Sequence, residues 1–122
     1  VGIDPGRTPY MVVLGDDEVL EHRRIGFESI VESINDCLKC YPARKTIVRV
    51  GGGFNGWRII LRIKNRVNAN IEVVDEAETT PRNDRLENRI YIDKYFSRLT
   101  GYKKRDAYAA LKIALRKGIE VV

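Results

Sequence analysis

Residues 1–25 read VGIDPGRTPYMVVLGDDEVLEHRRI and decide the fold, because two turns divide them into three short segments. The apolar residues 1–4 are closed by the Pro-Gly pair at 5–6, a strong turn signal. A second apolar segment, residues 10–14, leads through the turn at 15–17 into the alternating residues 18–25. Short strands separated by tight turns are typical of a meander. We therefore expect three antiparallel strands at the start of the chain.

Helices and strands alternate beyond this meander. Residues 46–50 and 70–75 are apolar or β-branched and predict two strands. Apolar positions recur at helical spacing in the remaining segments. The predicted helices cover residues 27–41, 55–68, 85–99 and 103–117. This order predicts one α/β domain over residues 1–122, with a mixed sheet of three meander strands plus parallel strands and with helices on both faces.

The composition is that of a soluble, basic protein. The 122 residues include 22 Lys and Arg against 17 Asp and Glu, and 43% of them are hydrophobic, which is enough for a core. No apolar run approaches the roughly 18 residues of a membrane span, and no signal peptide precedes the first strand. We expect a cytoplasmic protein without a membrane partner.

The charges alternate in sign along the chain. Residues 1–42 carry 4 basic and 8 acidic side chains, and residues 43–70 carry 7 basic and none acidic. Residues 71–100 carry 5 and 7, and residues 101–122 carry 6 and 2. A basic surface around clustered carboxylates would give this pattern, and nucleic acid is the partner it suggests. Charge scattered over a soluble basic protein remains the alternative.

Three acidic residues stand at positions suited to metal chemistry. Asp4 ends the first strand, Glu76 follows the strand over residues 70–75, and Asp106 lies in the first turn of the last predicted helix. Ligands collect at strand ends on one edge of such a sheet. Carboxylates meeting there could hold two Mg²⁺ ions for phosphodiester hydrolysis. A turn former, a solvated loop residue and a helix N-terminal charge are the ordinary alternatives for the same three residues.

Three motifs carry a resemblance to a known family. The opening VGIDPG (1–6) resembles the first strand of the RuvC/YqgF branch of the ribonuclease H-like superfamily. DEAETT (75–80) is similar to the YqgF element Asp-Glu-x-x-Thr-Thr, and RDAYAA (105–110) resembles the start of that family's final helix. The motifs stand in the family order, and the predicted elements agree across essentially the whole chain.

The resemblance implies a Mg²⁺- or Mn²⁺-dependent endonuclease of ribonuclease H-like fold, with Asp4, Glu76 and Asp106 as metal ligands and catalytic residues. It also implies structured substrates, such as four-way DNA junctions or precursor ribosomal RNA, and a symmetric junction would call for a homodimer. Two positions depart from the resolvases. The strand over residues 46–50 brings no acid, which favours the YqgF arrangement, and Ala109 replaces a further acid. A non-catalytic nucleic-acid-binding module of the same fold, or a nucleotide or sugar-phosphate site, stays open.

Two basic groups could hold nucleic acid. Lys103, Lys104 and Arg105 directly precede Asp106, and Arg58 and Arg62 lie on one face of the predicted helix 55–68. Basic side chains neutralise phosphates, and nearby aromatic residues can stack on unpaired bases. Solvated helix faces and core aromatics are the alternative interpretation.

The remaining motifs are weak. Gly51-x-Gly53-x-x-Gly56 matches the dinucleotide-binding fingerprint, but too few strands follow it for a dinucleotide-binding sheet. We therefore favour a tight turn from strand to helix, then a phosphate contact at the helix start, and a dinucleotide site last. Cys37 falls on the apolar face of its helix and Cys40 off it, which predicts a core cysteine rather than a redox pair. His22 is the only histidine, so histidine-based nucleophilic catalysis has little to build on.

Overall fold

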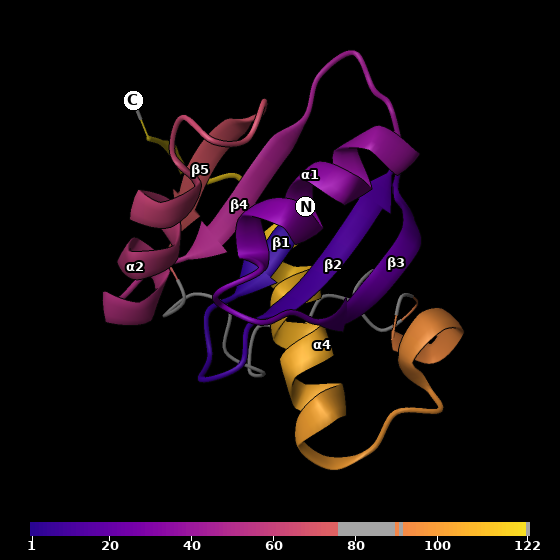
Figure 1. Ribbon diagram of the computed structural model, residues 1–122. Helices are drawn as coiled ribbons and strands as arrows, with labels where there is room; N and C mark the ends of the chain where they lie inside the picture. Colours follow the sequence, from indigo (N-terminus) through magenta and orange to yellow (C-terminus); the bar gives the residue numbers. More distant parts are fainter. Residues whose placement is uncertain (76–89, 91, 122) are drawn as a thin grey trace.

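The computed structural model describes residues 1–75, 90 and 92–121 and contains one mixed sheet of six strands (Figure 1). The strand order is β3-β2-β1-β4-β5-β6. The strands are β1 (Gly2–Asp4), β2 (Tyr10–Gly15), β3 (Glu18–Arg24), β4 (Ile47–Gly51), β5 (Asn70–Val74) and β6 (Ile119–Glu120). The helices are α1 (Ile30–Cys40), α2 (Phe54–Ile63), the π-helical turn η3 (Ile92–Phe96) and α4 (Gly101–Leu115). The predicted α/β class with a mixed sheet is confirmed.

The first three strands form the predicted meander. β1 pairs antiparallel with β2, and β2 pairs antiparallel with β3, with an irregularity between Val13 and Leu14. β1 then pairs parallel with β4, and β4 pairs parallel with β5. The parallel strands are joined by α1 and α2, since a parallel connection needs a crossover of this length. Three parallel strands therefore end at one edge of the sheet.

Helices cover both faces of the sheet, as predicted. The inward residues of α1 and α2 pack on one face against Ile3, Met11 and Val50. α4 packs on the other face, where Tyr10 and Val12 meet its small side chains. Successive residues of a strand point to opposite faces, which explains why Ile3 and its neighbours Gly2 and Asp4 face different helices. In the part of the chain described, no helix is long and apolar enough to cross a membrane.

Gly2 allows α4 to lie directly on β1. A Cβ atom at this position would collide with the carbonyl oxygen of Ala110 and with the backbone and side chain of Ala114. Only a residue without a side chain permits so close an approach of helix and strand. Gly2 therefore determines how α4, and with it Asp106, is seated on the sheet.

Three segments differ from the sequence-based expectation. α2 ends at Ile63 rather than near residue 68, because Lys64 leaves the helix and Asn65 adopts a positive φ of 65°. The short strand β6 was not predicted, since it has two residues and Ile119 is exposed. Of the predicted helix over residues 85–99, only residue 90 and residues 92–99 are described, and their regular part is η3.

Candidate functional site

Asp4 lies at the carboxyl end of β1, on the face covered by α4. It pairs across the sheet with Tyr10 of β2, and Tyr10 pairs with Arg24 of β3. Directly paired residues point to the same face, and the buried Tyr10 packs against Ala107 and Ala110 of α4. Asp4 and Arg24 therefore flank Tyr10 in one row on the α4 side.

Asp106 reaches the same row from the helix. It lies in the second turn of α4, one turn later than predicted, and its Oδ2 atom lies 2.9 Å from Nη1 of Arg24. Its charge also acts on Tyr10, whose pKa is raised mainly by burial and further by Asp106, against the opposing effect of Arg24. The structure thus brings Asp4 and Asp106 to the same end of the α4-covered face.

Glu76, the third predicted acid, lies outside the described residues. The strand that precedes it, β5, is described to its end, and Val74 of β5 lies beside Gly51 of β4. β4 in turn has Val50 beside Ile3 of β1. β5 therefore leads toward the same edge of the sheet at which Asp4 stands.

The donor chemistry of the described acids fits a hard divalent cation. Asp4 and Asp106 are both partly exposed and offer carboxylate oxygens, which Mg²⁺ and Mn²⁺ accept. No group of three potential ligands occurs among residues 1–75, 90 and 92–121. Two of the three predicted ligands are thus brought to one edge by described residues, with the positive charge of Arg24 beside them.

A tyrosine–histidine pair adjoins this row and was missed by the sequence analysis. The Tyr10 hydroxyl and Nδ1 of His22 are hydrogen-bonded at 2.8 Å, and the His22 ring lies edge-on to Phe96 with a centroid distance of 4.8 Å. Burial, and then the charge of Lys103, lowers the pKa of His22. His22 is therefore a partly buried imidazole of the edge strand β3 that packs between Tyr10 and Phe96.

The basic run before Asp106 lies on the exposed beginning of α4. Lys103 and Arg105 are exposed, Lys104 is partly buried, and the guanidinium of Arg105 lies 5.6 Å from the centroid of the Tyr102 ring. Tyr102 itself is 76% exposed. A cationic and aromatic surface thus adjoins Asp106 on the same helix.

Arg58 and Arg62 have different surroundings although they lie one turn apart on α2. Both guanidinium groups stand over the Phe27 ring, at 4.8 and 5.0 Å from its centroid. Arg62 also donates to the carbonyl oxygen and a carboxylate oxygen of Glu28, each at 3.1 Å. The charge of Arg62 is therefore balanced within the protein, whereas Arg58 is exposed and forms no salt bridge with a described residue.

Arg49 lies in β4, the strand that contains no acidic residue. Its Nε donates to Glu72 at 3.0 Å and its Nη1 donates to the carbonyl oxygen of Ala114 at 2.6 Å. Glu72 also accepts from the amide of Gly118 at 2.9 Å. This position is used to attach the end of α4 to the sheet.

The glycine motif and the cysteines have structural explanations. Gly53 precedes α2 with a φ of 94°, and a Cβ at Gly56 would collide with the carbonyl oxygen of Gly51. The glycines therefore serve the turn and the close packing of helix on strand, as the first of the three interpretations held. Cys37 is buried and Cys40 exposed, as predicted, and burial, with Glu21 nearby, raises the pKa of Cys37 to about 11.

Comparison of the chain with known protein families, with curated proteins and with solved structures finds no match.

Proposed function

We propose that this chain is a metal-dependent endonuclease of the ribonuclease H-like RuvC/YqgF type, which cleaves structured DNA or RNA. The sheet supports the proposal, because a three-stranded meander extended by parallel strands, with helices on both faces, is the architecture that the sequence resemblance implies. The three motifs that carry the resemblance stand on β1, after β5 and on α4.

The observation that carries the proposal is the common position of Asp4 and Asp106. They come from opposite ends of the chain, yet both lie beside the row formed by Tyr10 and Arg24. Two carboxylates on the same face and at the same end of the sheet are the kind of ligands that a divalent cation needs.

Each acid has a defined role in the proposed site. Asp4, Glu76 and Asp106 would hold two Mg²⁺ or Mn²⁺ ions, which supply activation of water and stabilise the leaving oxygen of the phosphodiester. Arg24 balances the charge of Asp106. Lys103, Lys104 and Arg105 surround this end of α4 with positive charge and attract the phosphate backbone.

A nucleic-acid-binding module without cleavage is the second candidate. The ion pair between Arg24 and Asp106 favours it, because an acid already neutralised by arginine needs no metal ion. Both candidates share the basic surface and differ only in whether the acids are used.

One panel of substrates distinguishes them. A four-way junction, a duplex, a single strand and precursor ribosomal RNA are each incubated with Mg²⁺, Mn²⁺ or a chelator. The nuclease should cut at least one substrate only with metal, and Asp4→Asn should abolish cutting while binding persists. Binding without cleavage by the wild type would support the module and contradict the nuclease.

A further inference from the structure

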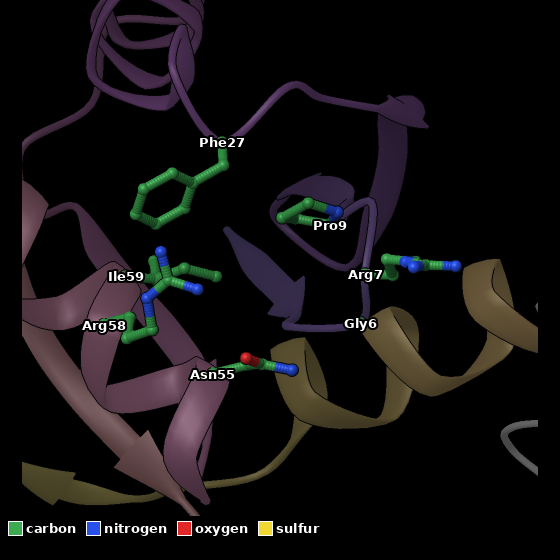
Figure 2. Close-up of a pocket in the computed structure, with 7 residues that line it drawn as sticks. All are labelled: Gly6, Arg7, Pro9, Phe27, Asn55, Arg58 and Ile59. Carbon is green, nitrogen blue, oxygen red and sulfur yellow. The ribbon is translucent and has the colours of Figure 1, made fainter.

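A pocket of about 380 Å³ opens near the sheet edge that carries Asp4, on the side of α2 and not of α4 (Figure 2). It lies between the turn after β1, the segment before α1 and the first turns of α2. Gly6, Arg7, Phe27, Asn55 and Arg58 contribute to its lining. Figure 2 shows Arg58 and the amide of Asn55 beside the opening, whereas Arg7 lies at the far rim with its guanidinium directed outward.

The pocket is cationic. Arg7 and Arg58 are both exposed, and neither forms a salt bridge with a described residue. The Phe27 ring supports the Arg58 guanidinium at 4.8 Å and leaves its N–H groups free for an anion. Among the residues that the structure describes, none of those lining the pocket is acidic. The Arg58 guanidinium and the Asn55 amide are donors suited to the oxygens of a phosphate, and Arg7 adds positive charge at the rim.

The pocket adjoins the proposed catalytic edge. Gly6 and Arg7 follow Asp4 by two and three residues. Since consecutive Cα atoms are 3.8 Å apart, Gly6 lies at most about 7.6 Å from Asp4. The pocket also continues the basic stretch over residues 43–70, which contains 7 basic and no acidic side chains.

We propose that this pocket binds a backbone phosphate of the nucleic acid, at a neighbouring position on the strand whose bond is presented to Asp4 and Asp106. The inference rests on the proposed function for the identity of the ligand. The exposed position of both arginines suits a phosphate within a long strand, because a strand can pass over an open rim. Arg7 and Asn55 thereby join Arg58 as binding residues, whereas Arg62 holds Phe27 and Glu28 in place.

The test measures binding without cleavage. The anisotropy of a fluorescein-labelled four-way junction is followed in EDTA over a series of salt concentrations for the wild type, Arg7→Gln, Arg58→Gln and the double variant. Each single change should weaken binding about fivefold and lower the slope of log K against log salt by about one, and the double change by about two. Arg44→Gln, an exposed arginine in the loop before β4, is the matched control and should change affinity less than twofold.

A second variant leaves both arginines intact. Asn55→Asp places a negative charge in the pocket and should weaken binding about tenfold, while an acid in the first turn of α2 favours the helix, so folding is retained. If the wild type binds the junction but the pocket variants behave like Arg44→Gln, the pocket proposal is wrong and the proposed function stands. If the wild type binds no nucleic acid, both are wrong.

Discussion

Nη1 of Arg24 lies 2.9 Å from Oδ2 of Asp106, and this contact joins the edge strand β3 to helix α4. The two side chains remain 36% and 27% exposed, so the pair contributes little to stability, about 0–1 kcal/mol. Its importance is electrostatic, because it balances the charge of Asp106. An arginine at this place competes with a cation for the same carboxylate.

Removing that arginine should strengthen metal binding. In Arg24→Gln, the loss of the positive charge paired with Asp106 should raise Mn²⁺ affinity about fivefold, equivalent to roughly 1 kcal/mol. Electron paramagnetic resonance of free Mn²⁺ measures this directly. Arg23→Gln is the control, since Arg23 pairs with Glu21 instead. Unchanged or weaker Mn²⁺ binding by Arg24→Gln would show that Arg24 does not oppose a cation here.

His22 should make stability depend on pH. Its pKa is lower in the folded protein than the ordinary value of 6.5, chiefly through burial and secondly through Lys103, so protons bind more readily to the unfolded chain. The free energy of unfolding should therefore be highest above pH 6.5 and fall as the pH decreases below it. Urea unfolding of the wild type and of His22→Asn measures the difference, which isolates this single histidine. The same pH dependence in both proteins would contradict the assignment.

Gly2 should be intolerant of any side chain. Gly2→Ala puts a methyl group into the backbone of Ala110 and Ala114, which should cost about 2–3 kcal/mol of unfolding free energy. Chemical denaturation measures the loss. Gly6→Ala is the control, since the nearest atom to a Cβ there is 3.9 Å away. Equal stability of the two variants would mean that α4 does not rest on β1 as described.

Much of the fold follows from local patterns, whereas the site does not. The turns after residues 4 and 14 predict the meander, and apolar spacing predicts α1, α2 and α4. β6 has two residues and an exposed Ile119, so no pattern precedes it. The roles of Arg24 and Tyr10 depend on strand register, which becomes visible only once β1, β2 and β3 are paired. The one signal in the sequence is that Arg24 follows His22 by two residues, so both side chains point to the same face of β3.

The pocket was hidden for a similar reason. Arg7 and Arg58 are 51 residues apart in sequence, and nothing local connects them. Parallel pairing of β1 with β4 brings the turn after β1 beside the start of α2. Arg58 and Arg62 do lie on one face of α2, as their spacing predicts. Their spacing does not show that Glu28 pairs with Arg62 and not with Arg58.

Calorimetric titration of Mn²⁺ into the wild type, Asp4→Asn and Asp106→Asn shows whether the two carboxylates share a metal site, with Asp36→Asn on the exposed side of α1 as the control. We expect the wild type and the control to bind Mn²⁺ equally, and each of the other two changes to weaken binding at least tenfold with folding intact. Equal Mn²⁺ binding by all four proteins, or none by the wild type, would contradict a shared metal site at Asp4 and Asp106.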